Sequence, residues 1–190
     1  MIGRLLMLTM LVVSFVSISV KETYTNTEYK FSMIFPSTDI TRAQVKPTST
    51  IDPIGVISWS AFDDTKDFMG QVEVAGYPNL SKMIIDRAFL REQVAVFTQD
   101  GTSMTLVGEP VDEHFHGYQA VSFHVTIPIK DNNVVSGIVK LIYIPAMNRF
   151  YVVDAMAIID GHDKEHQKQA MLDSFRLDIK DSDDEQTFAQ

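Results

Sequence analysis

The segment Phe150–Ile159 constrains the fold of this chain more than any other segment. It is apolar at successive positions apart from Asp154, so a strand built from it must be buried on both faces. Such a strand lies inside a sheet, with other elements packed on each side. We therefore predict a central strand over residues 149–159, covered by helices on both faces.

Other segments alternate apolar and polar residues, which is typical of strands with one buried face. Residues 29–35, for example, place aromatic and apolar side chains at every second position before Pro36. Short turns join the later segments and predict an antiparallel meander. The fold class we predict is α+β, with an antiparallel sheet of about six strands covered by helices. The expected strands are 29–35, 54–62, 68–77, 103–109, 117–128, 134–144 and 149–159, with 54–62 and 68–77 as a hairpin.

Two helices are expected. Residues 80–99 contain no Gly or Pro, follow a capping Asn79 or Ser81, and end at Asp100-Gly101. Apolar side chains cover most of the circumference of this helix, which predicts broad burial. A second helix over about residues 163–175 is apolar mainly at its C-terminal end and should dock through that end. A short last strand is expected to follow it.

The N-terminus has the pattern of an export signal. Arg4 precedes the apolar run Leu5–Val20, whose 16 residues are fewer than the roughly 20 that span a bilayer as a helix. Ser17 and Ser19 satisfy the small-residue rule for cleavage, so we predict a signal peptide over residues 1–19; an uncleaved anchor is the alternative. The folded domain is then expected over residues 20–178, followed by an acidic disordered tail over 179–190.

Charge and cysteine content narrow the function classes. The chain has 16 Lys and Arg against 25 Asp and Glu, and no Cys. Loss of residues 1–19 removes only Arg4 among the charged residues and leaves a net charge of −10. This charge disfavours nucleic acid and anionic lipid as partners, and no disulfide can form. We expect an exported, periplasmic or extracellular bacterial protein without a membrane span after cleavage of the signal.

Asp154 is the acid whose position is hardest to explain by packing. A carboxylate inside an apolar strand is costly to desolvate unless a partner compensates. If residues 146–148 form the loop, residues whose numbers sum to 294 lie opposite each other, and Lys140 faces Asp154. We predict a buried Lys140–Asp154 ion pair, with a functional acid as the alternative.

A recognition surface can be predicted from two further patterns. Residues 37–53 are rich in Thr, Ser, Pro and Asp, which favours a long binding loop with a short extended piece around Val45. The strand 117–128 has a polar face formed by Ser122, His124 and Thr126. Trp59, in a strand beside the loop, is expected in the core or, alternatively, facing a ligand.

The histidines are the remaining candidates for chemistry. His114 and His116 lie at i, i+2, and His162 and His166 at i, i+4, so either pair could supply half of a zinc site. Neither pair completes a metal signature, and solvated surface histidines are the favoured interpretation. There is no nucleophile elbow and no phosphate-binding loop in the sequence, so we expect no catalytic residues and no cofactor.

The order of the expected elements, together with three short stretches, carries a family resemblance. The stretches are Tyr29–Pro36, Gly108-Glu109-Pro110 followed by His116–Ala120, and Ser174–Leu177. Together they resemble the PsbP-like α/β/α sandwich superfamily and, within it, bacterial exported domains of unknown function related to DcrB. The resemblance covers about residues 24–178. Unlike many bacterial relatives, this chain has no lipobox cysteine, which argues against tethering through an acylated cysteine.

The resemblance implies a non-enzymatic domain and supplies no active-site residues. We therefore expect an exported binding or accessory module of the bacterial cell envelope, not an enzyme, that recognises a protein or small molecule through its surface. The alternative from another class is a metal-dependent or other hydrolase with a histidine and acid site.

Overall fold

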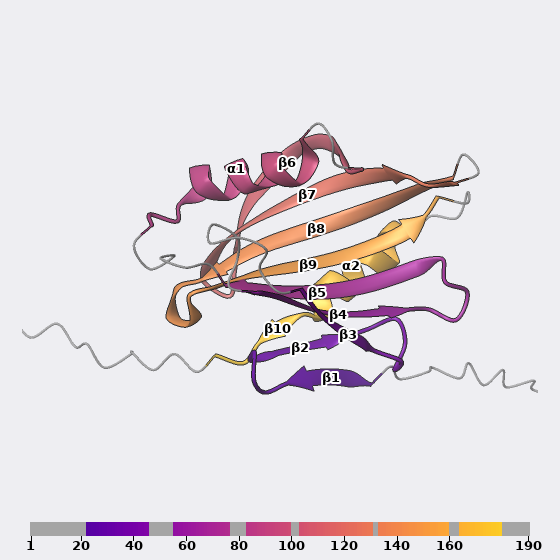
Figure 1. Ribbon diagram of the computed structural model, residues 1–190, viewed down its shortest axis with the longest axis horizontal. Helices are drawn as coiled ribbons and strands as arrows, with labels where there is room; N and C mark the ends of the chain where they lie inside the picture. The colour runs from indigo at the N-terminus through magenta and orange to yellow at the C-terminus, as the bar shows by residue number, and fades with distance from the viewer. Residues whose placement is uncertain are drawn as a thin grey trace, which may run out of the picture.

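The computed structural model describes residues 22–45, 55–76, 83–99, 103–130, 133–159 and 164–179. The predicted signal peptide and almost all of the predicted acidic tail lie outside these residues. Within them, most of the chain is strand, and two α-helices are present (Figure 1). None of the described helices has the length and apolar composition needed to cross a membrane.

The main sheet has seven antiparallel strands in the order β3-β4-β5-β9-β8-β7-β6. This is one strand more than we predicted, because β3 forms inside the segment predicted as a long loop and pairs with β4. β3 lies where a short extended piece was expected around Val45, and residues 46–53 of the predicted loop lie outside the described residues. The strands are β3 (Thr41–Val45), β4 (Gly55–Phe62), β5 (Phe68–Gly76), β6 (Thr105–Phe115), β7 (Tyr118–Pro128), β8 (Val134–Ile144) and β9 (Arg149–Ile158).

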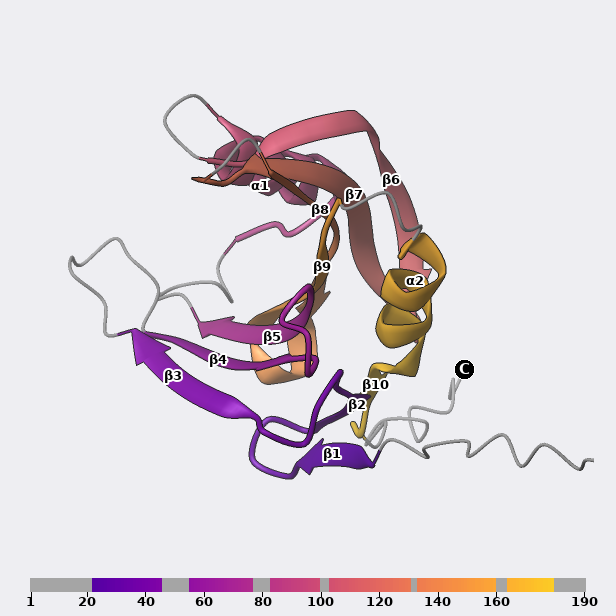
Figure 2. The ribbon, with the colours of Figure 1, turned by 90° about the vertical axis from the view of Figure 1, so that its right-hand side faces the viewer.

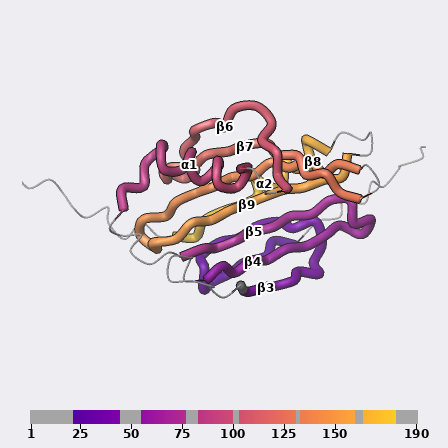
Figure 3. The backbone as a smooth tube through the Cα atoms, turned by 45° about the horizontal axis from the view of Figure 1, so that its top comes forward, coloured from indigo at the N-terminus to yellow at the C-terminus, as the bar shows by residue number. Residues whose placement is uncertain are grey.

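The meander and the central strand are both present. Strands β6 to β9 follow one another through short turns, and β9 stands fourth of seven between β5 and β8 (Figure 3). Odd-numbered residues of β9 such as Tyr151 and Val153 are buried in one apolar cluster, whereas Phe150, Val152 and Met156 are buried in another. The two-faced apolar pattern of this segment therefore did predict its place in the sheet.

One face of the main sheet, here called the α2 face, packs against α2 (Glu165–Ser174) and a second sheet. The second sheet has three antiparallel strands in the order β1-β2-β10, and α2 and this sheet lie on the same side of the main sheet (Figure 2). Gly70 permits the close approach of α2, since a Cβ at this position would lie 2.3 Å from the Met171 sulfur. The small sheet consists of β1 (Thr23–Asn26), β2 (Phe31–Ile34) and β10 (Arg176–Leu177).

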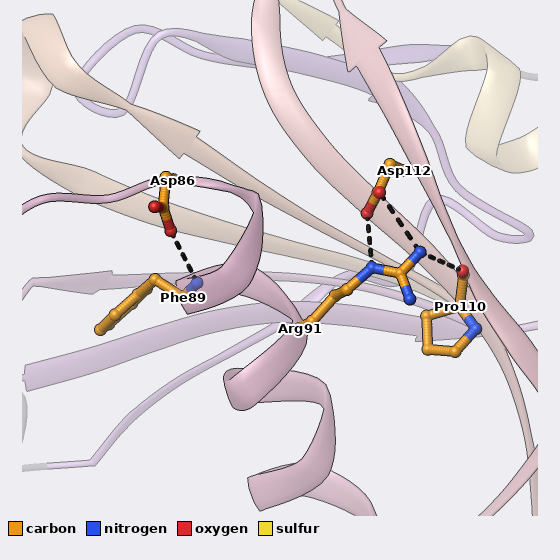
Figure 4. Close-up of polar contacts among 5 residues, drawn as sticks. All are labelled: Asp86, Phe89, Arg91, Pro110 and Asp112. Atoms are coloured by element: carbon orange, nitrogen blue, oxygen red, sulfur yellow. Dashed lines mark hydrogen bonds and ion pairs between the residues drawn. The ribbon is translucent and has the colours of Figure 1, made fainter.

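The opposite face, here called the α1 face, packs against α1 (Arg87–Thr98), which buries Leu90 and Val94. This helix is shorter than predicted. Asp86, not Asn79 or Ser81, is its N-cap, and the Asp86 side chain accepts a hydrogen bond from the Phe89 amide (Figure 4). Broad burial was also wrong, since only one stripe of the helix is buried and Ile84, just before it, is 84% exposed.

Helix α1 is fixed beside the outer strand β6. The Arg91 guanidinium donates to both carboxylate oxygens of Asp112 and to the Pro110 carbonyl (Figure 4). The hydrogen bonds from Arg91 are the main reason that the pKa of Asp112 is lowered. The ladder between β6 and β7 is interrupted between Val107 and Val111, where β6 contains an irregular segment with Gly108 at φ +74°. The α/β/α sandwich is therefore matched only roughly, with one helix on each face of a strand-rich domain.

Candidate functional site

The predicted pairing of Lys140 with Asp154 is wrong. The two strands pair with a register in which Asp154 lies opposite Val139 and Lys140 opposite Val153. Neighbouring residues of a strand point to opposite faces, so this shift of one residue places Lys140 on the α2 face and Asp154 on the α1 face.

The turn between β8 and β9 explains the shift. Pro145–Met147 form one 3-10 turn, and Asn148 follows in the left-handed region at φ 50°. The strands close with Ile144 opposite Arg149, which makes the loop one residue longer than we assumed. An Asn is among the few residues other than Gly that adopt this conformation readily.

Lys140 is 8% exposed and has a partner of its own on the α2 face. Its ammonium nitrogen lies 3.2 Å from a carboxylate oxygen of Glu113 and 5.0 Å from the centre of the Phe115 ring. The Ser122 hydroxyl donates to the same carboxylate. This buried charge is therefore compensated by an anion and an aromatic face, and the Ser122 hydroxyl hydrogen-bonds the anion.

Asp154 is 6% exposed, and its Oδ1 atom has no hydrogen-bond partner. It stands between Gln71 of β5 and Val139 of β8 on the α1 face. Burial, and then the charge of Glu73, raise the pKa of the Asp154 carboxyl well above its ordinary value. Both effects favour the neutral carboxylic acid over the carboxylate, and one of its oxygens has no partner.

Polar side chains extend from Asp154 across β5 and β4. Gln71 lies opposite both Asp154 and Ser60, and the next row on the same face brings Glu73 opposite Ser58. The Gln71 amide donates to the Glu73 carboxylate at 2.6 Å, and burial raises the pKa of Glu73. We call this set the polar cluster: Ser58, Ser60, Gln71, Glu73 and Asp154.

An apolar pocket of about 310 Å³ adjoins the polar cluster on the α1 face. Met156 and Met69, which line it, lie two residues from Asp154 and Gln71 on the same strands. Phe62 and Ile129 contribute exposed apolar surface at its edge. Other lining residues include Ile127, Val135 and Ile158.

The predicted recognition surface on β7 is partly occupied by internal contacts. Ser122 is bound to Glu113, and the Nδ1 atom of His124 lies 3.6 Å from the Glu165 carboxylate on α2. Beside them, Lys168 is 3% exposed and donates to Ser136 at 2.7 Å. His124 itself remains half exposed, and Thr126 is half-buried. These residues thus share the α2 face, but only part of their polar surface is open.

Trp59 does not face solvent. It is 2% exposed and packs against the rings of Tyr29 and Phe31, each 5.2 Å away, with the Arg42 guanidinium 5.9 Å from its ring. The first of the two alternatives, core packing, is therefore the observed one, and Trp59 does not contribute to a ligand surface.

Three of the four histidines in the predicted pairs lie within the described residues, and these three are on different elements. His114 is on β6 and His116 in the following turn at φ 49°, both exposed, while His166 is exposed on α2 and His162 lies outside the described residues. In the described part of the chain, no group of three or more His, Cys, Asp or Glu side chains is arranged to hold a metal ion.

Sequence reasoning missed Ser58, Ser60, Gln71 and Glu73. A signal was present, because Ser58-Trp59-Ser60 and Gln71-Val72-Glu73 each place two polar residues on the same face of a strand. That these faces meet Asp154 depends on the pairing of β5 with β9, which joins distant parts of the chain.

Comparison with solved structures identifies the architecture. The solution structure of cyanobacterial PsbP (CyanoP) from Synechocystis sp. PCC 6803 superposes with a TM-score of 0.56 at 13% sequence identity, covering 87% of this chain and 98% of that one. The chain has a PsbP-like fold. The crystal structure of LpqN, involved in cell envelope biogenesis of Mycobacterium tuberculosis, matches at a TM-score of 0.39 and 15% identity over 80% of this chain and 93% of LpqN.

The comparisons confirm the predicted resemblance at the level of the PsbP-like fold; the relation to DcrB stays a prediction. No protein-family model and no curated protein sequence matches the chain.

Proposed function

We propose that the protein is an exported, non-catalytic binding or accessory module of the cell envelope, and that it recognises its partner through the α1 face of its main sheet. The observation that carries this proposal is the uneven covering of that face. Helix α1 packs on β7 and β6, whereas none of the described helices or strands covers β3, β4 and β5 there (Figure 3).

The side chains on this part of the sheet suit recognition. The polar cluster presents hydroxyls, an amide and carboxyls from adjacent strands of a rigid sheet, and the apolar pocket adjoins it. Binding sites commonly combine an apolar lining with a few polar groups that orient the ligand. Residues on a sheet hold their positions without any reorganisation of loops.

The location in the envelope rests on the sequence. The apolar N-terminal run with Arg4 favours export, and the acidic composition favours a partner other than nucleic acid. The PsbP-like fold is consistent with an accessory role, although a fold can serve many functions.

The test is site-specific photocrosslinking in the native envelope. A photoreactive residue at Ser58 on the α1 face should give a defined adduct, whereas the same group at exposed His166 on α2 should not. Equal labelling at both positions, or none at Ser58, would contradict recognition through this face. Recovery of the full chain from the cytosol with residues 1–19 intact would contradict the envelope role.

A further inference from the structure

Asp154 differs from the other deeply buried charged groups in the described part of the chain. Lys140 is bound to Glu113, and Lys168 contacts Glu165 at 2.5 Å and Ser136 at 2.7 Å. The Oδ1 atom of Asp154, in contrast, has no partner, although 94% of the residue surface is buried. A buried polar atom without a partner costs about 1–3 kcal/mol, so its retention in a sheet requires an explanation.

The position of Asp154 suggests what could supply a partner. The carboxyl lies on the same sheet face as Glu73, which is only half-buried, and Gln71, two residues before Glu73 on β5, lies directly opposite Asp154. None of the ion pairs between described residues includes Asp154 or Glu73. Two acids therefore share one region of the sheet with Ser58 and Ser60, and these groups can all accept hydrogen bonds.

The apolar pocket indicates the chemistry of the rest of a ligand bound beside these acids. Met156 and Met69 are each two positions from a member of the polar cluster, a separation of roughly 7 Å along a strand. A volume of about 310 Å³ lies at the lower end of the range of about 300–1,000 Å³ typical of small-molecule sites. The flexible side chains of methionine adapt to ligands of different shape.

We propose that the α1 face binds a small ligand with a protonated amine on an unbranched apolar chain, the amine at Asp154 and Glu73 and the chain in the apolar pocket. An ammonium group has three donors and no acceptor, which matches a set of carboxylate and hydroxyl oxygens that can all accept hydrogen bonds. The inference deepens the proposed function by naming the class of ligand that this face accepts.

The electrostatics of the two acids support this assignment. Burial raises the pKa of both carboxyls, and the charge of Glu73 raises the pKa of Asp154 further. A bound cation removes that penalty, because an opposite charge within a few ångströms favours the ionised carboxylate. No other charged residue of β4, β5, β8 or β9 lies on this face. The pocket itself is also lined by Lys66 and Asp67 from the turn between β4 and β5, and Asp67 lies 3.9 Å from the Lys164 ammonium.

Calorimetric titration of the full chain with butyl-, hexyl- and octylammonium chloride tests the inference. The affinity should rise about 3- to 4-fold for each added methylene that enters the pocket. Octanoate, which has a chain of similar length and the opposite charge, should not bind. Equal binding of octanoate and octylammonium, or affinity that does not change with chain length, would overturn the assignment.

Variants separate the two parts of the site. Glu73→Gln and Asp154→Asn should each weaken octylammonium binding at least about 10-fold, the scale of one lost charge-assisted hydrogen bond. The matched control is Asp112→Asn, which removes a carboxyl on the same face that Arg91 already neutralises. Unchanged affinity in both Glu73→Gln and Asp154→Asn, or an equal loss in the control, would overturn the role of the two acids.

The pocket has its own variant. Phe62→Ser with Ile129→Ser shortens two side chains that are 50% and 40% exposed, so the fold should be retained. This double variant should still prefer octylammonium to octanoate but lose most of the dependence on chain length. A chain-length dependence equal to that of the natural sequence would overturn the role of the pocket.

The outcomes also distinguish this inference from the function on which it rests. If alkylammonium ions do not bind but a photoreactive group at Ser58 still forms a defined adduct in the envelope, the amine assignment fails and the proposed function stands. If alkylammonium ions bind as expected but Ser58 forms no adduct, the envelope role fails and the amine site stands.

Discussion

The two faces of the main sheet differ in whether their buried ionisable side chains have partners. On the α2 face, Lys140 and Lys168 are each paired with a carboxylate and a hydroxyl-bearing side chain lies beside each of them. On the α1 face, Asp154 is equally buried but one of its oxygens has no partner. Lys140 and Lys168 are explained by partners within the fold. The unpartnered oxygen of Asp154 is not, and it agrees with the ligand that we propose for the α1 face.

The largest expected effect is on the α2 face. Lys140→Ala should lower the free energy of unfolding by about 2–3 kcal/mol, because it leaves half-buried Glu113 without its cation and removes packing against Phe115. Urea denaturation measures the change. Lys140→Met, which keeps the volume, should lose less than Lys140→Ala; an equal loss in both would mean that packing contributes nothing.

A smaller effect of opposite sign is expected on the α1 face. Asp154→Asn should raise the melting temperature at pH 7 by about 2–4 °C, equivalent to about 1 kcal/mol, because it removes the cost of ionising or protonating a buried acid. A lower melting temperature at pH 7 would contradict an unpartnered carboxyl.

The pH dependence of the same variant follows from the raised pKa of Asp154. A folded pKa above the unfolded one means that the contribution of the acid is most favourable below about pH 3.9 and is lost as the pH rises through the folded pKa. The advantage of Asp154→Asn should therefore vanish near pH 3.5 and grow toward neutral pH. Paired thermal scans of variant and natural sequence between these limits test the sign.

A double-mutant cycle sharpens the comparison further. Because Lys140 and Asp154 lie on opposite faces, the effects of Lys140→Met and Asp154→Asn should add to within about 0.5 kcal/mol. The cycle of Lys140→Met with Glu113→Gln should instead show coupling of about 1 kcal/mol. Strong coupling in the first cycle would contradict this register and indicate an ion pair between Lys140 and Asp154.

An effect of about the same size as that of Asp154→Asn concerns the attachment of α1. Asp86→Ala should destabilise the protein by about 1 kcal/mol through loss of the N-cap to the Phe89 amide. Asp86→Ser, which keeps an oxygen acceptor, should recover most of the loss. Equal melting temperatures for Asp86→Ala and the natural sequence would place the start of the helix elsewhere.

Local pattern was sufficient for the strands and insufficient for their pairing. The alternation at Phe31 and Met33 and the two-faced run around Val153 are properties of neighbouring residues, and each predicted a strand that the structure contains. The register of β8 with β9 depends on one residue in a turn, which composition does not reveal. That single residue decided whether Lys140 and Asp154 shared a face.

The candidate site was predicted only in part for a related reason. Asp154 stood out because its own strand is apolar, but Gln71 and Glu73 became relevant only through the pairing of β5 with β9. The start of α1 was misplaced because Ser81 and Asp86 are both good caps, and local preference does not choose between them. The sequence likewise left two alternatives for Trp59, the core and a ligand-facing position, because local pattern does not show which side chains pack on it. The contact with the Tyr29 ring places it in the core.

The interrupted ladder of β6 has a consequence for solubility. This strand ends the main sheet, and an outermost strand offers unpaired amides and carbonyls to any neighbouring molecule. Its irregular segment includes Pro110, which has no amide hydrogen, and the break falls between exposed Val107 and Val111. A second molecule that paired along β6 would meet this break and the missing Pro110 amide, which disfavours edge-to-edge association at a border that carries exposed valines.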